Sequence, residues 1–319
     1  MRRVIAGILM ATLVAAAGCN RQTAPAGEAR PRVALVLKTL NHPYFLDMQR
    51  GAREAAGRLG VELVVQAAER ELDVEKQVQI IENLVQAGVS ALCVAPSGSR
   101  EVVSAIAKAN QAGIPVVVLD TRVDADAAAA AGLKLVSFIG SDNYQGGRIA
   151  GEFLVRESGG TAKVAILEGI PGHETGDSRL RGFRDAIAAS PGIRVLASQP
   201  ANWERDQGFT VFQNLLQAHR DLDTVFACND LMALGALEAI AAAGRDGHIR
   251  VIGYDALDDA RKAIAEGRMD ASVAQSPEEM GRLAIETAVK AIRGEAVPAE
   301  QMVAITLVTR EAAGAAPAR

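Results

Sequence analysis

Residues 32–45 of the 319-residue chain read RVALVLKTLNHPYF. The apolar run at 33–37 shows no alternation of apolar and polar positions, which is typical of a strand buried on both faces of a parallel sheet. Polar and aromatic residues follow this run at once. Because ligands of open α/β sheets bind at the carboxyl ends of the strands, the stretch predicts an α/β domain with a binding site after its first strand.

The same unit, a short apolar run and then a helical segment, recurs along the chain. Segments such as 74–87 and 143–156 carry apolar residues at three- and four-residue spacing, which predicts helices. Together with the apolar runs they predict a doubly wound α/β architecture with parallel sheets. The predicted strands are 33–37, 61–65, 89–94, 116–119, 135–139, 164–167, 193–197, 224–227 and 251–253.

These units form two consecutive series, which predicts two similar domains joined by a hinge. The first series runs to about Gly140 and the second starts near Ser141, and an alanine-rich segment at 121–132 breaks the rhythm where they meet. A ligand is expected in the cleft where the strand ends of the two domains face each other. We expect an N-terminal lobe of residues 32–140 plus 276–303 and a C-terminal lobe of residues 141–275 plus 304–312.

Composition limits the class of protein. The length suits two α/β domains of moderate size, and a hydrophobic fraction of 49% with a charged fraction of 23% is that of a globular chain. Lys and Arg number 34 against 38 Asp and Glu, a net charge of −4. A nucleic-acid partner is not expected, because binding to phosphates needs a basic face.

Residues 1–18 are expected to be a signal peptide. Arg2 and Arg3 precede an apolar stretch at 4–16, which is shorter than the roughly 20 residues that span a bilayer. The mature chain is therefore expected in the periplasm or another extracytoplasmic space.

Residues 16–19 read AAGC and resemble the bacterial lipobox, whose cysteine becomes the lipidated first residue of the mature protein. Ala16 stands where the lipobox usually has leucine, and the alternative is an ordinary signal peptide with a chance cysteine. Acyl chains on Cys19 would hold the protein to a membrane surface. Residues 19–31 are polar, with Pro and Gly, and are expected to form a flexible tether.

Cys93 and Cys228 each lie in a strand-like apolar run, without CxxC or metal-ligand spacing. Two buried, unpaired thiols are expected. A disulfide in an oxidising compartment is the alternative.

Polar and aromatic residues follow six of the predicted strands, as a ligand site at the strand ends requires. Asp120 and Asp255 each end an apolar strand, where a free carboxylate is costly without a partner. The residues concerned are Asn41, His42, Tyr44, Phe45, Asp120, Thr121, Arg122, Arg179, Asn202, Trp203, Asn229, Asp230, Tyr254 and Asp255.

Five motifs carry a resemblance to a known family. They are KTLNHPYF at 38–45, IGSDNYQGG at 139–147, NDLMALGA at 229–236, VIGYD at 251–255 and AQSP at 274–277. In this order they resemble the ribose-type periplasmic binding proteins, and the likeness runs from about residue 32 to 309. The resemblance implies a monomer of two hinged lobes that closes on a monosaccharide and delivers it to a membrane ABC permease.

Matched residue by residue, the resemblance also implies the ligand contacts. Asp120 and Asp255 would accept hydrogen bonds from sugar hydroxyls, and Arg179 would donate to two ligand oxygens. Phe45 and Trp203 would cover the two faces of the sugar ring, one from each lobe. The full expected set is His42, Tyr44, Phe45, Asp120, Thr121, Arg179, Trp203, Asn229, Asp255 and Gln275.

Two positions depart from the ribose pattern. Ribose binders carry an amide where His42 stands and an arginine where Thr121 stands. Arg122 comes one residue later, and a shift of one residue along extended chain points a side chain the other way. The expected ligand is therefore a ribose-like pentose or a related hexose. His42 also titrates near neutrality in its ordinary state, which predicts a pH-dependent affinity.

Structural roles compete with ligand contact at several positions. Tyr44 could be a core residue at a helix start, and Arg179 could form a surface ion pair. Asp230 is expected to cap the helix that follows it, and Asp142 and Asn143 are expected to cap theirs.

The sequence lacks the motifs that would indicate other functions. The GIPG sequence at 169–172 has no phosphate-loop spacing, the four histidines have no zinc-like spacing, and no nucleophile elbow is present. No catalytic residue, metal or cofactor is expected, although Asp120 and Asp255 are formally a carboxylate pair. A transcription regulator would need a helix-turn-helix where the signal sequence stands. A sugar sensor that presents its closed form to a chemoreceptor or sensor kinase remains the alternative.

Overall fold

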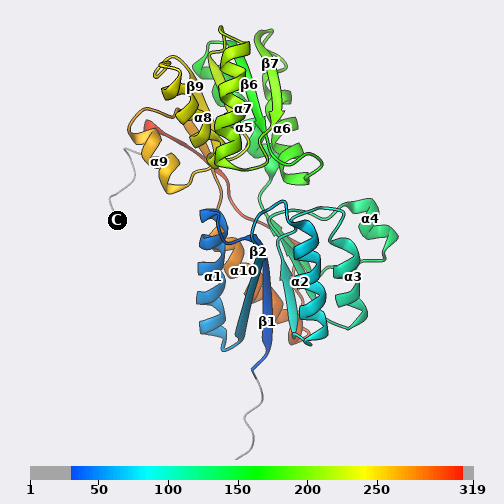
Figure 1. The fold of residues 1–319 in the computed structure, drawn as a ribbon. Coiled ribbons are helices and arrows are strands. Elements are labelled where there is room, and N and C mark those ends of the chain that lie inside the picture. Colours follow the sequence, from blue (N-terminus) through cyan, green and yellow to red (C-terminus); the bar gives the residue numbers. More distant parts are fainter. Residues whose placement is uncertain (1–29, 312–319) are drawn as a thin grey trace, which may run out of the picture. The chain divides into compact units, whose positions relative to one another are not determined.

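The computed structural model describes residues 30–311 (Figure 1). The expected signal peptide, the expected lipidation site Cys19 and the tether up to residue 29 lie outside the described residues. Within the described range the chain forms two α/β domains, each built on a six-stranded sheet. Each of the nine predicted strands overlaps an observed one.

The first sheet has the strand order β11-β5-β4-β3-β1-β2, and all its pairs are parallel. Its strands are β1 (Arg32–Thr39), β2 (Glu62–Ala68), β3 (Ala91–Val94), β4 (Val116–Leu119), β5 (Ser137–Gly140) and β11 (Glu300–Met302). The helices of this lobe are α1 (Pro43–Leu59), α2 (Val74–Gln86), α3 (Val103–Gln111), α4 (Ala125–Ala130) and α10 (Pro277–Ile292).

Helices cover both faces of this sheet, which explains why β1 is apolar at successive positions. Val33 and Leu35 pack in one core cluster with residues of α1 and α10. Ala34 and Val36 pack in the other cluster, with residues of α2 and α3. Burial on both faces is what the unbroken apolar run predicted.

The second sheet has the order β12-β10-β9-β8-β6-β7. Its strands are β6 (Thr161–Glu168), β7 (Gly192–Pro200), β8 (Thr224–Ala227), β9 (Arg250–Asp255), β10 (Ala271–Ala274) and β12 (Thr306–Thr309). Its helices are α5 (Asn143–Glu157), α6 (Glu174–Ile187), α7 (Arg205–Ala218), α8 (Asp230–Ala242) and α9 (Asp258–Ala265).

Two details differ from the sequence prediction. The edge strand β12 pairs antiparallel with β10, so the second sheet is not wholly parallel. The alanine-rich segment at 121–132 does not lie where the two series meet. It forms α4 between β4 and β5, inside the first lobe.

The chain passes between the sheets three times. It leaves the first sheet after β5, returns after β10 to form α10 and β11, and enters the second sheet again as β12. None of the helices within residues 30–311 has the length and apolar character that crossing a bilayer requires.

Close helix packing in the second lobe fixes α6, which carries Arg179. A Cβ atom on Gly182 would lie 2.0 Å from the carbonyl oxygen of Tyr144, and one on Gly147 would lie 2.0 Å from that of Arg179. Only glycine at these positions allows α5 and α6 to approach so closely.

Candidate functional site

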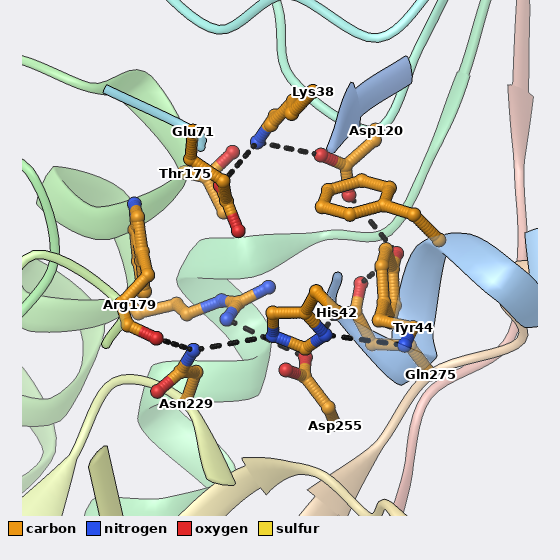
Figure 2. Close-up of a pocket in the computed structure, with 12 residues that line it drawn as sticks. Lys38, His42, Tyr44, Glu71, Asp120, Thr175, Arg179, Asn229, Asp255 and Gln275 are labelled. Carbon is orange, nitrogen blue, oxygen red and sulfur yellow. Dashed lines mark hydrogen bonds and ion pairs between the residues drawn. The ribbon is translucent and has the colours of Figure 1, made fainter. Parts of the chain in front are cut away.

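A cavity of about 290 Å³, partly open to solvent, lies at the carboxyl ends of strands from both sheets (Figure 2). The lining residues are Lys38, His42, Tyr44, Phe45, Glu71, Asp120, Thr175, Arg179, Trp203, Asn229, Asp255 and Gln275. Nine of the ten residues expected from the sequence are among them, and Thr121 is not.

The strand ends that deliver these residues have unusual backbone geometry. Asp120 has φ 66°, Trp203 has φ 69° and Asp255 has φ 106°. Within residues 30–311, the non-glycine residues with positive φ all lie in the loops that hold these three side chains. Such conformations are uncommon and cluster at functional sites, where the surrounding structure holds them.

Asp120 is the centre of the charged network in the first lobe. Its carboxylate lies 2.9 Å from the Lys38 ammonium and accepts a hydrogen bond of 2.9 Å from the Tyr44 hydroxyl. Burial alone would raise the pKa of the Asp120 carboxyl, but the Lys38 charge holds it below its ordinary value. Asp120 is therefore an ionised acceptor that faces the cavity.

Glu71 follows β2 and is the second carboxylate near Lys38, at 3.7 Å. Burial outweighs the attraction of Lys38 and raises the pKa of Glu71 to about 7. Glu71, Lys38 and Thr175 line the cavity but were not expected from the sequence. Lys38 lies in the quoted KTLNHPYF motif, which is the one signal that could have pointed to it.

Arg179 projects from α6 and is buried. Its Nε donates to Asn143 Oδ1 at 2.9 Å, its Nη1 donates to the Cys228 carbonyl at 2.7 Å, and its guanidinium lies 3.6 Å above the Tyr254 ring. The alternative of a surface ion pair is wrong, because only 3% of the residue is exposed.

Asp255 ends β9 and lies 3.6 Å from Arg179 Nη1. Gln275 Nε2 donates to its carboxylate at 2.8 Å. Burial raises the pKa of Asp255 to about 6 in spite of the nearby Arg179. The free-energy cost of removing this carboxylate from water is thus only partly offset by its contacts with Arg179 and Gln275.

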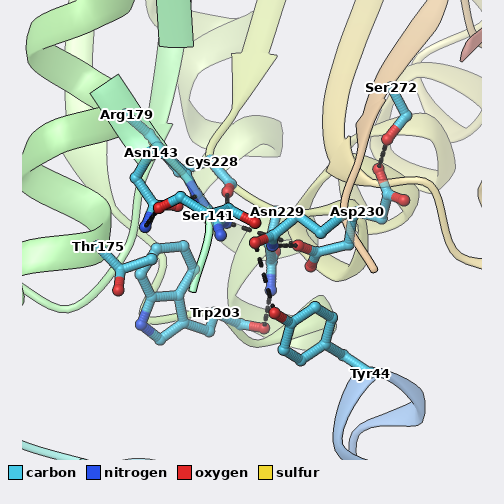
Figure 3. A network of polar contacts seen from close by, with 12 residues as sticks. Tyr44, Ser141, Asn143, Thr175, Arg179, Trp203, Cys228, Asn229, Asp230 and Ser272 are labelled. Atoms are coloured by element: carbon cyan, nitrogen blue, oxygen red, sulfur yellow. Dashed lines mark hydrogen bonds and ion pairs between the residues drawn. The ribbon is translucent and has the colours of Figure 1, made fainter. Parts of the chain in front are cut away.

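Asn229 lines the cavity and also takes the capping role that was expected for Asp230 (Figure 3). Asn229 caps α8, because its side chain accepts from the Met232 amide at 2.9 Å, and its Nδ2 donates to the Trp203 carbonyl at 3.0 Å. Asp230 does not cap the helix. Its buried carboxylate accepts from the Leu257 amide and the Ser272 hydroxyl, each at 2.7 Å, and so fixes the loop that follows Asp255.

Of the two other residues expected to cap a helix, Asp142 does so and Asn143 does not. Asp142 caps α5 by accepting from the Gln145 amide at 2.9 Å, as predicted. Asn143 instead accepts from Arg179, so its side chain orients a residue that lines the cavity.

His42 caps α1. Its Nδ1 accepts from the Tyr44 amide at 3.1 Å. Burial, and then the positive charge of Lys38, lower the pKa of His42 to about 3. The expectation that His42 titrates near neutrality is therefore wrong for this buried state.

Aromatic side chains line the cavity from both lobes. Phe45 and Tyr44 meet edge to face at a centroid distance of 5.2 Å, and both belong to the core cluster beneath α1. Tyr44 is thus a core residue whose hydroxyl also reaches the cavity. Trp203 lines it from the second lobe and is 5% exposed.

Thr121 and Arg122 lie outside the cavity lining. The Thr121 hydroxyl is 2.8 Å from that of Thr175, a contact between the two lobes. Arg122 pairs with Glu300 at 2.8 Å and stacks 3.8 Å from the Phe138 ring. Its side chain points away from the ligand side, as the one-residue shift predicted.

The two cysteines of the described residues are buried and free, as expected. Burial raises the pKa of each thiol to about 12, so both are thiols rather than thiolates at neutral pH. Residues 30–311 contain no cluster of three or more His, Cys, Asp or Glu that could hold a metal ion.

Comparison with known proteins gives the class to which this fold and site belong. The family model described as periplasmic binding protein domain matches residues 33–296. The chain therefore belongs to the periplasmic binding protein family, which confirms the resemblance and the two-domain α/β fold.

Individual relatives agree in sequence and in structure. The ribose import binding protein of Escherichia coli (strain K12) is 40% identical over 302 residues, which cover 95% of this chain and 98% of the relative. The D-ribose/D-allose-binding protein of Pseudomonas aeruginosa is 36% identical, over 92% of this chain and 94% of the relative. An ABC transporter periplasmic solute binding protein from Actinobacillus succinogenes 130z, solved with bound D-allose, has a TM-score of 0.84 at 39% identity. This likeness covers 89% of the present chain and 99% of the solved one.

Proposed function

We propose that the chain is the solute-binding component of an ABC importer and binds one monosaccharide in the cavity between its lobes. The observation that carries this proposal is the cavity lining, in which carboxylates, amides, a guanidinium group and aromatic rings converge from both lobes. A sugar hydroxyl both donates and accepts, and its burial costs several kcal/mol unless it is paired. A small cavity with a highly polar lining meets that requirement.

The charges of the cavity favour a neutral ligand. Lys38 and Arg179 supply two positive charges, and Asp120 lies against the first and Asp255 against the second. Glu71 has a pKa of about 7, so the lining has no large excess of either sign near neutral pH. A charged ligand would leave one of these groups without its partner, which is costly in a buried site.

The ligand contacts that we propose are the nine residues expected from the sequence that line the cavity, with Phe45 and Trp203 against the two faces of the sugar ring. Lys38, Glu71 and Thr175 join them as further lining residues. Thr121 would act through Thr175 rather than touch the ligand. Ribose and allose are the first candidates, because relatives named for these sugars share 34–40% of their residues with this chain.

Ligand binding would work through closure of the lobes. A ligand shifts a conformational equilibrium only by contacts that differ between the two states. A sugar held by Asp120 from one lobe and Asp255 from the other gains its full set of contacts only in the closed form. The lobes that move would be residues 32–140 plus 276–303 and residues 141–275 plus 304–312, as the distribution of strands between the two sheets supports.

The remaining partners belong to the same proposal. The protein would be a monomer, held in an extracytoplasmic space by acyl chains on Cys19, and its closed form would dock on the membrane permease. A chemoreceptor or sensor kinase that recognises the closed form is the alternative partner. Turnover of the sugar is not expected.

The experiment that tests the ligand class is a thermal-shift screen of the mature chain with pentoses, hexoses, deoxy sugars, polyols, nucleosides and amino acids. A ligand at 100 times its Kd adds about 2.7 kcal/mol to the free energy of unfolding. For a chain of this size that raises the melting temperature by a few degrees. A shift with ribose, allose or a similar sugar supports the proposal, and shifts with nucleosides or amino acids alone would contradict it.

We predict that Asp255→Ala abolishes the sugar-induced shift and leaves the melting temperature of the free protein near that of wild type. Burial already opposes the charge of Asp255, and Arg179 keeps its bonds to Asn143 and the Cys228 carbonyl, so the change removes a ligand acceptor without leaving Arg179 unpaired. Calorimetric titration and melting curves of the free protein measure the two effects. Asp246→Ala, at an exposed acidic position, is the control and should behave as wild type. A large loss of stability in the free Asp255→Ala protein would identify a structural role instead.

A further inference from the structure

His42 and Asn229 present nitrogen atoms to the same point of the cavity, one from each lobe (Figure 2). We propose that His42 Nε2 and Asn229 Nδ2 both donate hydrogen bonds to one ligand oxygen, which accepts from both and donates to neither. His42 is then a specificity-determining residue that recognises an acceptor. The inference rests on the proposed sugar-binding function. It adds that the part of the cavity formed by His42 and Asn229 selects a ligand oxygen that accepts hydrogen bonds.

The hydrogen-bond partner of His42 Nδ1 decides which ring nitrogen carries the proton. Nδ1 lies 3.1 Å from the backbone nitrogen of Tyr44, which can only donate. A neutral imidazole has one N–H, so acceptance at Nδ1 leaves the hydrogen on Nε2. The helix cap at the start of α1 thus makes Nε2 a donor toward the cavity.

The ring stays neutral because of what surrounds it. Burial and the charges of Lys38 and Arg179 lower the pKa of His42, and Asp120 raises it, with a net result of about 3. At neutral pH the ring therefore has one hydrogen, and the Tyr44 amide confines it to Nε2.

The orientation of the Asn229 amide is fixed in a similar way. Its Oδ1 accepts from the Met232 amide at 2.9 Å, so Nδ2 is directed to the other side. There Nδ2 donates one hydrogen to the Trp203 carbonyl at 3.0 Å. The second N–H of this amide remains for the cavity side, where His42 Nε2 lies 3.5 Å away.

Two donors that face each other cannot bond to one another. A buried donor without an acceptor costs about 1–3 kcal/mol. Nitrogen atoms 3.5 Å apart can both reach a single oxygen, because an oxygen at about 2.9 Å from each completes a triangle with normal hydrogen-bond lengths. A ligand oxygen with two lone pairs at this apex would satisfy both.

The opposite polarity is found at Asp120 and Asp255, whose carboxylates can only accept when they are ionised. The cavity therefore has a donating edge, formed by His42 and Asn229, and accepting positions elsewhere. A sugar oriented in this way places its ring oxygen, or a hydroxyl that donates to another partner, against the donating edge. Substituents that can only donate are excluded there.

The test starts from the sugar found in the thermal-shift screen, and its absence would refute the proposed function rather than this inference. In the complex with ¹⁵N-labelled histidine, two-bond ¹⁵N–¹H spectra should show His42 as the neutral form with hydrogen on Nε2. The signal that is lost in His42→Asn assigns His42, and His248→Ala, which removes an exposed histidine, should leave that signal unchanged. Protonation on Nδ1 in the complex would overturn the proposal.

The second part compares wild type and His42→Ala with deoxy and deoxyfluoro analogues of the sugar at each hydroxyl position, and with the carba analogue that lacks the ring oxygen. For one analogue, the affinity of wild type should be about tenfold lower than for the parent sugar, which is the size expected for a lost hydrogen bond. The affinity of His42→Ala for the same analogue should fall by less than about threefold. If that analogue is a deoxy sugar, its fluoro counterpart should recover part of the affinity, because fluorine accepts but cannot donate. The proposal is wrong if no analogue shows this coupling, or if fluorine at the coupled position recovers nothing.

His42→Ala also removes the cap of α1 and can fail to fold. His42→Asn keeps a side-chain oxygen for the Tyr44 amide and an amide nitrogen for the cavity. We expect it to fold and to retain part of the coupling at the same ligand position. Coupling at a different position would contradict the proposal.

Discussion

At the scale of single residues, three carboxylates line the cavity and their pKa values differ. Asp120 is held below its ordinary value by Lys38 in spite of burial, whereas burial raises the pKa of Glu71 to about 7 and that of Asp255 to about 6. The difference follows distance, since the Lys38 ammonium is 2.9 Å from Asp120 and 3.7 Å from Glu71. The same lysine therefore cannot stabilise both charges equally.

This difference predicts how Glu71→Gln changes stability with pH. The folded pKa of Glu71 is about 7 and its ordinary value is 4.5, so folded wild type binds the extra proton between these values. Its stability thus rises as the pH falls from about 7 to 4.5, and above pH 7 the buried carboxylate is ionised and destabilises the fold by a constant amount. Glu71→Gln has no such charge, so relative to wild type it should gain about 3 kcal/mol between pH 4.5 and pH 8.

Urea unfolding at the two pH values measures this difference. Glu75→Gln, at an exposed position in the first turn of α2, is the control and should show a much smaller dependence on pH. Equal effects of Glu71→Gln at both pH values would show that Glu71 is not buried as the structure describes.

At the scale of elements, the position of α6 depends on its close contact with α5. We predict that Gly182→Ala destabilises the protein by about 1–3 kcal/mol, the usual cost of an overpacked contact. The added methyl group would lie 2.0 Å from the Tyr144 carbonyl and would push apart the two helices. Because α6 carries Arg179, the affinity for sugar should fall as well.

Gly57→Ala is the matched control. Gly57 is exposed within α1, and a Cβ atom there meets nothing within 4 Å. Alanine favours a helix over glycine by about 0.5–1 kcal/mol, so this variant should be slightly more stable than wild type. Chemical denaturation compares the two variants, and a neutral Gly182→Ala would contradict the packing argument.

Sequence patterns predicted the central strands because burial on both faces leaves an unbroken apolar run, as at β1. They missed β11 and β12, which are short, partly buried edge strands, and also β10, which is buried but only four residues long. Nine residues of the cavity lining were predicted because each follows a strand or belongs to a recognisable motif. Lys38 and Glu71 were missed because a buried charge depends on partners far away in the sequence, here Asp120.

Asn229 and Asp230 show another limit of sequence reasoning. Either residue can cap a helix, and the sequence does not reveal which side chain faces the first turn. Asp230 instead bonds to Leu257 and Ser272, which come 27 and 42 positions later. Only the fold brings these groups together.

At the scale of the whole molecule, contacts that need no ligand join the two lobes. Thr121 meets Thr175, His173 Nε2 lies 3.3 Å from the Pro96 carbonyl, and the Glu174 amide donates to Ser99 at 3.3 Å. His173 is 2% exposed, and burial, followed by the charge of Lys38, lowers its pKa to about 3. These contacts exist only while the lobes are together.

We predict that protonation of His173 at low pH opposes closure of the two lobes. In an open form the side chain would be exposed, with its ordinary pKa of 6.5, so the open form binds a proton that the closed form excludes. The contribution of His173 to closure is therefore complete above pH 6.5 and is lost as the pH falls from 6.5 toward 3. Below pH 6.5 the ratio of wild-type affinity to His173→Gln affinity should fall by up to about tenfold per pH unit.

Calorimetric titration with the sugar at pH 5.5 and 7.5 measures this ratio. The use of a ratio cancels the titration of His42, Glu71 and Asp255, which both proteins share. His248→Gln, at an exposed position, is the control, and its ratio to wild type should be the same at both pH values. A constant ratio for His173→Gln would mean that His173 does not change its environment when the lobes close.

The return of the chain to the first sheet after β10 also sets the order in which the protein can be completed during synthesis. Val33 and Leu35, near the start of the described chain, share a core with Met280 and Ile285 of α10. The first lobe to leave the ribosome therefore cannot fully bury one face of its sheet until β6 to β10 of the second lobe, and then α10, have been made. Until then that face lacks its second helix, and the N-terminal lobe depends for its completion on segments that are translated after most of the second lobe.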